Sequence, residues 1–194
     1  MDMKDWISKL NIKPTGKTKT ENINWENYFL MMKRWYYRLR DTDYYNEDGF
    51  SINQLKMEED YYWTIFIIIY HFKDWIRMAT SKEKVENYVK NSKSLSICAD
   101  ICNSNKHLFL RYSKTGDKET RLLNTLIEAE YKNKKSFFPI TLIINRHKMI
   151  DAYTLVEDCM QDWGKFIINE HLKIPILKEE NSVSNFVKWE PKLK

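Results

Sequence analysis

The chain is poor in the residues that interrupt regular structure. Its 194 residues include only four Gly and four Pro. Because Gly and Pro mark turns, and glycine loops cradle phosphates closely, this scarcity indicates long elements and argues against a nucleotide-binding loop. The stretch Gly16-Lys17-Thr18 resembles the end of such a loop, but Asn11 stands where its first glycine is required. We therefore expect no nucleotide cofactor, and no other cofactor.

Cysteines and long apolar runs are also scarce. Cys98, Cys102 and Cys159 lie within apolar helical patterns, which predicts reduced core thiols and no disulfide framework. The longest apolar run, Tyr61 to Tyr70, is about half of the roughly 20 residues that a bilayer-spanning helix needs. The first residues lack the apolar stretch of a secretion signal. These absences predict a cytoplasmic protein with no membrane partner.

The composition is that of one compact domain. Hydrophobic residues make up 43% of the chain, aromatic residues 14% and charged residues 30%, which is enough apolar material for a substantial core. The 32 basic residues nearly balance 27 acidic ones, and the formal net charge is +5. A moderate positive charge permits a nucleic-acid partner without requiring one.

Helical periodicity dominates most of the sequence. Apolar residues recur at spacings of three and four, and the second of these segments is apolar all round, which is typical of a central helix. Ser81 and Asp151 are placed to act as N-caps. The predicted helices span about 24–41, 51–79, 81–90, 95–106 and 151–172.

The periodicity changes to two after Lys106, which predicts strands at about 108–113, 122–132 and 137–145. Turns at 114–117 and 133–136 would join these strands into an antiparallel meander. The predicted fold is therefore α+β: a helical bundle with a three-stranded β-meander inserted before the last long helix. This domain would span residues 21–174, between a lead-in at 1–20 and a tail at 175–194.

Two sets of polar residues interrupt the apolar helices. His71 and Asp74 are three residues apart and share one helix face. Asp100, Asn103 and His107 share a face of another predicted helix. Buried polar groups need partners, so we expect each set to face the other. Cations that could neutralise the carboxylates are Lys73, Arg77 and Lys106.

This constellation has three interpretations. In the structural one, Asp74, Asp100 and Asn103 cap or cross-link helix ends. In the catalytic one, His107, supported by His71, transfers protons while a lysine or arginine stabilises developing negative charge. In the third, histidines and aspartates bind a metal ion, but the Glu-x-x-His repeats of di-iron bundles are absent, and we expect no metal.

The segment from Cys98 to His107, preceded by the helix Tyr70-His-Phe-Lys-Asp-Trp75, resembles the HEPN-type helical domains. That superfamily contains metal-independent ribonucleases, toxins and defence proteins, and its hallmark is an arginine followed a few residues later by a histidine. His107 matches the family histidine and Asn103 the polar residue after the arginine. Cys102 stands at the position of the arginine itself. The resemblance covers roughly residues 24–107 and the last helix.

The resemblance implies a protein of a prokaryotic defence, toxin or stress system that binds or cleaves RNA. Cys102 cannot supply the cationic fork of an arginine, so either another residue provides the charge or the chain has lost catalysis. The implied catalytic residues are Asp100, Asn103, Lys106 and His107, supported by His71, Asp74 and Arg77. The alternative is a non-catalytic interaction module whose polar cluster is structural, with a second copy or another protein as its partner.

Basic residues also suggest a phosphate-binding surface. In an up-and-down sheet, Lys114 of one turn can approach Arg146 and Lys148 of another. Arg34 and Arg38, on the first predicted helix, could add to this surface. The neighbouring Trp35, Tyr36 and Tyr37 are assigned to the core by their helical spacing. Basic residues in turns also commonly serve only to keep a protein soluble, so a phosphate-binding surface is one of two interpretations of these residues.

Overall fold

A computed structural model describes residues 24–41, 52–106, 113–131, 134–146 and 148–175 of the chain. The expected lead-in at 1–20 and nearly all of the expected tail lie outside these residues. The elements in chain order are α2 (Trp25–Asp41), α3 (Ile52–Ile76), α4 (Lys82–Asn91), α5 (Lys93–Lys106), β1 (Arg121–Tyr131), β2 (Lys134–Asn145), β3 (Lys148–Asp151) and α6 (Ala152–Asn169). The fold is α+β, as predicted.

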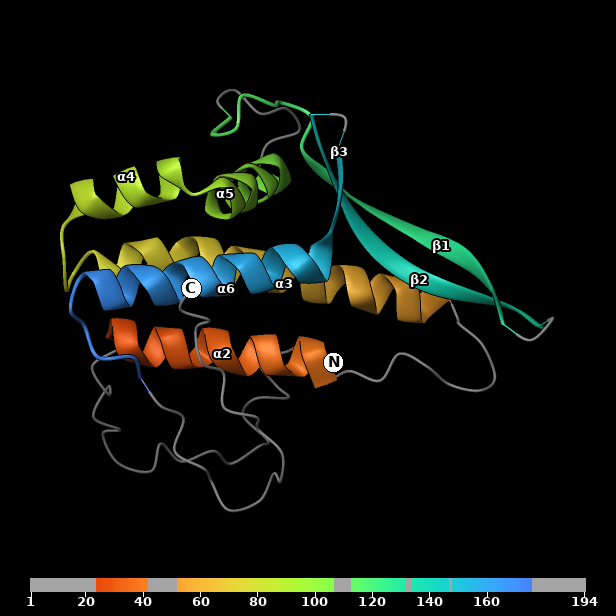
Figure 1. Ribbon diagram of the computed structural model, residues 1–194, viewed down its shortest axis with the longest axis horizontal. Helices are drawn as coiled ribbons and strands as arrows, with labels where there is room; N and C mark the ends of the chain where they lie inside the picture. Colours follow the sequence, from red (N-terminus) through yellow and green to blue (C-terminus); the bar gives the residue numbers. More distant parts are fainter. Residues whose placement is uncertain (1–23, 42–51, 107–112, 132–133, 147, 176–194) are drawn as a thin grey trace, which may run out of the picture.

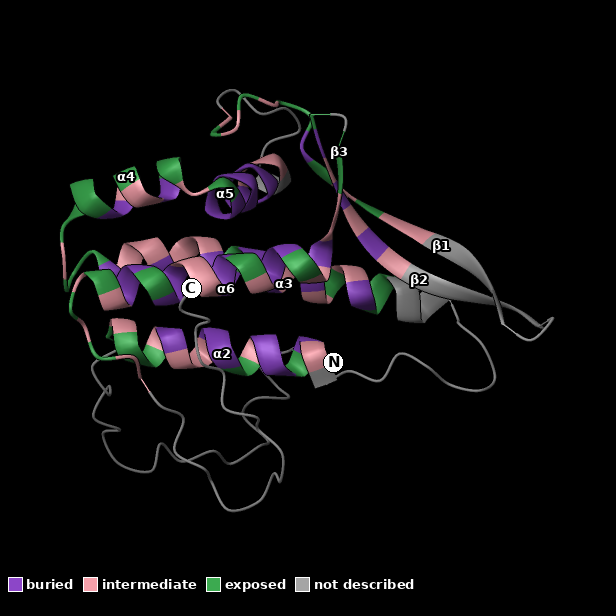
Figure 2. Cartoon of the chain, viewed as in Figure 1, coloured by how far each residue is buried: buried purple, intermediate pink, exposed green. Residues whose placement is uncertain are grey.

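The helices form three layers, with α3 and α6 in the middle (Figure 1). Helix α2 covers one side of this pair and helices α4 and α5 cover the other, while the sheet projects from one end. Helix α3 is therefore enclosed on both sides, and Ile65, Phe66, Ile69 and Phe72 are at most 1% exposed. This confirms the central position that its all-round apolar sequence predicted (Figure 2).

Aromatic side chains join the central pair of helices. The ring of Trp163 on α6 meets Phe72 of α3 edge to face, with 5.1 Å between the centroids. The indole Nε1 of Trp163 also donates a hydrogen bond of 3.1 Å to the carbonyl of Ile69. Edge-to-face packing suits the quadrupoles of the rings, and the hydrogen bond satisfies a donor that is otherwise buried.

Both predicted N-caps are confirmed. The Ser81 hydroxyl accepts a hydrogen bond from the Lys84 amide at 3.2 Å, at the start of α4. The Asp151 carboxylate accepts one from the Thr154 amide at 2.7 Å, at the start of α6. Each cap satisfies an amide that the first turn of a helix leaves without a partner.

The described sheet has three antiparallel strands in the order β1-β2-β3, and its third strand is one that the sequence did not predict. Its third strand is Lys148–Asp151, whereas the predicted 108–113 lies outside the described residues except for Ser113, which is in a loop. Strand β3 pairs with the end of β2 through Ile143↔Ile150. Four residues are too few to display a period of two, and the last of them is also the cap of α6.

The turns also differ from the prediction. Tyr131 pairs with Lys134 across the β1–β2 hairpin, so Lys134 and its successor belong to β2 and not to a turn. The expected approach of the 113–117 loop to Arg146 is confirmed, because the Arg146 amide donates to Asp117 at 2.6 Å. The Arg146 guanidinium contacts the Thr115 carbonyl and crosses Gly116, whose φ of 80° favours glycine.

Within the part of the chain that the structure describes, no helix combines the length and the apolar character needed to cross a bilayer.

Candidate functional site

A charged cluster lies where α3, α4, α5 and the 113–117 loop meet. We define the α3–α4 cluster as Tyr70, His71, Lys73, Asp74, Arg77, Glu86, Asn103 and Lys114. Helix α3 supplies the first four residues from adjoining positions of its C-terminal half, and Arg77 directly follows the end of the helix. The other three come from α4, α5 and the loop. The cluster thus contains four of the predicted site residues of α3 and α5.

His71 and Asp74 form a pair at the surface of α3. The imidazole Nδ1 lies 3.3 Å from a carboxylate oxygen of Asp74, and the two side chains are 33% and 36% exposed. Lys73 and Arg77 lie 3.5 and 3.4 Å from the other carboxylate oxygen. Partial burial alone would raise the pKa of Asp74, but the His71 hydrogen bond and the two cations outweigh it and lower that pKa. The carboxylate therefore stays ionised beside the imidazole.

Glu86 of α4 bridges two lysines from different elements. Its carboxylate oxygens lie 3.0 Å from the Lys73 ammonium and 3.6 Å from the Lys114 ammonium. Burial opposes ionisation of Glu86, but these two charges lower its pKa. In return, the hydrogen bond to Glu86 raises the pKa of Lys73 against the effect of burial. Lys73 also lies over the Tyr70 ring, 5.1 Å from its centroid.

Asn103 connects the two predicted sets of polar residues. Burial raises the pKa of the Tyr70 hydroxyl, and the Asn103 side chain acts against this shift. Because Tyr70 precedes His71 on α3, the C-terminal half of α5 lies close to the part of α3 that carries His71 and Asp74. Lys106 ends α5, and its side chain is not described. His107 lies outside the described residues.

Asp100 links helix α5 to the 113–117 loop. It is fully buried, and its carboxylate accepts hydrogen bonds from the Ser113 hydroxyl at 2.6 Å and the Lys114 amide at 2.5 Å. The Thr115 amide and hydroxyl donate two more, at 2.9 and 2.6 Å. A carboxylate has about four lone-pair sites, so these four donors occupy all the positions at which Asp100 can accept a hydrogen bond. Asp100 thus anchors the 113–117 loop and does not face His71 and Asp74 as expected.

Tyr70 and Glu86 were absent from the predicted site. Tyr70 lies inside the segment that the HEPN resemblance uses, but its position in an apolar run favours the core. Glu86 is one of several charged residues on a short polar helix, and its partners lie across two other elements. No local pattern in the sequence distinguishes Glu86 from its exposed neighbours.

The predicted phosphate-binding residues divide between two sides of the molecule. Arg34 and Arg38 are exposed on α2, and Arg38 lies over the Trp35 ring at 5.1 Å. Figure 1 places α2 and the 113–117 loop on opposite sides of the α3–α6 layer. Arg146 and Lys148, both exposed, lie at the loop side, and Lys114 belongs to the α3–α4 cluster. Tyr36 and Tyr37 are buried, as their spacing predicted, whereas Trp35 is only partly buried against the core.

The three cysteines are core thiols, as predicted. Cys98, Cys102 and Cys159 are free and buried. Burial, and hydrogen bonds with the other two thiols, raise the pKa of Cys98 well above its ordinary value, which keeps it protonated and unreactive. Among the described residues, no three His, Cys, Asp or Glu side chains are placed to hold a metal ion.

No family model matches the chain, and comparisons with curated proteins and with solved structures likewise give no match. The function must therefore be inferred from the residues themselves.

Proposed function

We propose that the chain is a HEPN-like protein of a prokaryotic defence, toxin or stress system that binds RNA at the α3–α4 cluster and cleaves it without a metal ion. The observation that supports this is the His71–Asp74 pair, partly exposed and flanked by Lys73 and Arg77. An imidazole held by a carboxylate is the usual arrangement of a general base. Neighbouring cations suit the phosphate that such a base would act upon.

In the proposed reaction the His71 imidazole takes the proton of a ribose 2′-hydroxyl. The 2′-oxygen then bonds to the adjacent phosphorus, and the bond from phosphorus to the 5′-oxygen of the next nucleotide breaks. Asp74 orients the ring and stabilises the imidazolium, and Arg77 and Lys73 stabilise the charge on the phosphate oxygens. In this proposal Asn103 and Lys106 position the phosphate, while His107 returns a proton to the leaving 5′-oxygen.

The test is cleavage of end-labelled RNA in EDTA by the wild type and by His71→Ala, Asp74→Asn and His107→Ala. We expect the loss of either histidine to slow cleavage by about 100- to 10,000-fold, the usual contribution of general acid–base catalysis. His171→Asn is the matched control, because His171 is exposed beyond α6 and its φ of 58° suits asparagine. Equal rates for the His71 and His171 variants would refute the role of His71.

Binding is measured separately, by fluorescence anisotropy with a labelled single-stranded RNA over a range of salt concentrations. Lys73→Gln and Arg77→Gln should each weaken binding, and each should flatten the dependence of log K on log salt by about 0.7 per lost phosphate contact. Lys82→Gln, at an exposed position of α4, is the control. Absence of both cleavage and binding by the wild type would overturn the proposal.

A second candidate function, a protein-interaction module, is favoured by the outer face of the sheet. The register places Leu123, Leu142 and Ile144 on this face, together with Met149. Leu123 is 39% and Met149 70% exposed, whereas Ile143 on the inner face is fully buried against the helices. Exposed neighbouring apolar side chains of this kind often mark an interface.

We propose a second copy of the chain as the occupant of this face. Arg121 and Asp151 lie at diagonally opposite corners of this face. When two copies pack face to face about a two-fold axis, Arg121 of each copy can therefore lie beside Asp151 of the other. Sedimentation equilibrium should then show a dimer that the substitution Leu123→Lys dissociates. Lys148→Glu is the control and should leave the dimer intact, because the strand register places Lys148 on the inner face of the sheet. A monomer at all concentrations would refute this candidate.

A further inference from the structure

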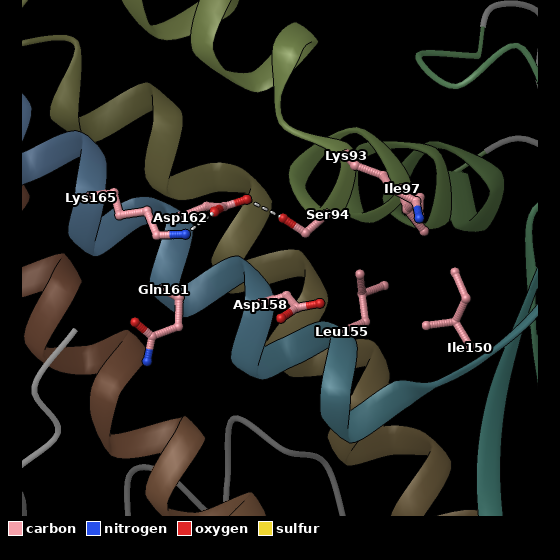
Figure 3. Close-up of a pocket in the computed structure, with 9 residues that line it drawn as sticks. All are labelled: Lys93, Ser94, Ile97, Ile150, Leu155, Asp158, Gln161, Asp162 and Lys165. Atoms are coloured by element: carbon pink, nitrogen blue, oxygen red, sulfur yellow. Dashed lines mark hydrogen bonds and ion pairs between the residues drawn. The ribbon is translucent and has the colours of Figure 1, made fainter. Parts of the chain in front are cut away.

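A cleft separates the first turns of α5 from α6 and β3, on a different part of α5 from the α3–α4 cluster (Figure 3). Its volume is about 300 Å³, at the small end of the range for ligand sites. Ile97, Ile150 and Leu155 form an apolar wall. The polar residues that line the cleft are Lys93, Ser94, Asp158, Gln161, Asp162 and Lys165.

The side chain of Asp162 is already bound by neighbouring residues of the protein. Its carboxylate accepts hydrogen bonds from the hydroxyls of Ser92 and Ser94 at 2.6 and 2.5 Å, and its other oxygen lies 3.3 Å from the Lys165 ammonium. These contacts tie the junction of α4 and α5 to α6. The polar groups left to meet a ligand are therefore chiefly those on the two rims of the cleft, Asp158 and Lys93.

Asp158 provides the negatively charged group at one rim of the cleft. Its side chain points into the cleft (Figure 3), and among the described residues it forms no hydrogen bond or ion pair. Partial burial, followed by the charges of Asp162 and Glu157, raises its pKa, whereas Lys165 and Lys93 act against this shift. A carboxylate surrounded by other carboxylates is stabilised when a cation is placed beside it.

Lys93 provides the positively charged group at the other rim of the cleft. It is exposed and occupies the first position of α5, where the helix dipole already concentrates positive charge. A lysine is unfavourable at this end of a helix, and a bound anion would neutralise both the ammonium and the dipole. The cleft therefore offers an anion site beside Ile97 of α5 and a cation site near Leu155 of α6.

We propose that this cleft binds a free α-amino acid with an aliphatic side chain. The ligand's ammonium group pairs with Asp158, its carboxylate pairs with Lys93, and its side chain packs on Ile97, Ile150 and Leu155. With a volume of about 300 Å³, the cleft has room for a molecule of the size of leucine. This site is separate from the proposed RNA site and does not depend on it.

The test is calorimetric titration of the full chain with three probes that share one branched aliphatic chain: leucine, 3-methylbutylamine and 4-methylpentanoate. The first carries both charges, and the others carry only the ammonium or only the carboxylate. We expect leucine to bind at least about tenfold more tightly than either analogue, since each analogue lacks one charge-assisted pair. Equal affinities, or no saturable heat from leucine at millimolar concentrations, would overturn the proposal.

Variants assign each charge to its rim. Asp158→Asn should reduce leucine affinity to that of 4-methylpentanoate and leave 4-methylpentanoate binding unchanged. Lys93→Gln should do the reverse, reducing leucine to the level of 3-methylbutylamine. Asp60→Asn and Lys82→Gln are the matched controls, because both residues are exposed on helices away from the cleft. Unchanged leucine affinity in Asp158→Asn would refute the assignment, whereas RNA cleavage should be unaffected by all four substitutions.

Discussion

Replacing Asp100 gives the sharpest test of how the fold positions the α3–α4 cluster. The fully buried carboxylate accepts four hydrogen bonds from Ser113, Lys114 and Thr115. In Asp100→Asn the side chain keeps its shape but loses its charge, and the amide NH₂ faces donors where an oxygen stood. In Asp100→Ala all four donors lose their partner.

The expected losses follow from these contacts. A hydrogen bond to a charged group contributes about 1.5–3 kcal/mol, and breaking a buried charged network costs about 3–5 kcal/mol. The loop donors are only partly buried, so water can replace some of the lost contacts. We therefore expect Asp100→Asn to lower the free energy of unfolding by about 2–4 kcal/mol, and Asp100→Ala by about 3–5 kcal/mol.

The assay is guanidinium unfolding followed by tryptophan fluorescence, together with amide hydrogen exchange. The amides of Lys114 and Thr115 should lose their protection in both variants, because each donates to Asp100. Asp60→Asn, on an exposed face of α3, should change the unfolding free energy by less than about 0.5 kcal/mol. A loss below about 1 kcal/mol in Asp100→Ala, with both amides still protected, would show that another contact holds the loop.

Three further outcomes are expected. Glu58 is buried and its pKa is raised, so the folded protein binds its proton more tightly than the unfolded chain does and this residue's contribution to stability falls as pH rises. Glu58→Gln should therefore stabilise the protein at pH 7 and reduce the pH dependence of its melting temperature. Trp163→Phe should cost about 2–4 kcal/mol in chemical unfolding, because it removes buried volume and the hydrogen bond to Ile69. The three cysteines should react with a thiol reagent only after unfolding; rapid reaction of the native protein would contradict their burial.

The sequence predicts the helices well because their signals are local. The apolar spacing of α2 and the caps Ser81 and Asp151 each depend on residues within one or two turns of one another. The paired strands β1 and β2 are long enough to display a period of two. Strand β3 has only four residues, so its assignment depends on pairing with β2, which no local pattern reveals.

The candidate site was predicted less well because its contacts are non-local. The sequence indicates that Asp74 has cations nearby, since Lys73 and Arg77 lie within one turn of it. It does not indicate that Glu86 joins Lys73 to Lys114, because this depends on how α4 and the loop pack on α3. The same holds for Asp100, whose spacing from Asn103 suggested a shared face while its partners lie 13 to 15 residues further along the chain.

The position of Asp100 also connects stability with the proposed RNA site. By fixing the backbone of Lys114, Asp100 places the ammonium of that residue within reach of Glu86, and Glu86 in turn holds Lys73 beside Asp74. The buried carboxylate thus acts on the cluster through three successive ion pairs, although it never meets a ligand itself. Because exposed ion pairs contribute little to stability, an ordered chain of them at a surface is better explained by the positioning of charge than by the stability of the fold.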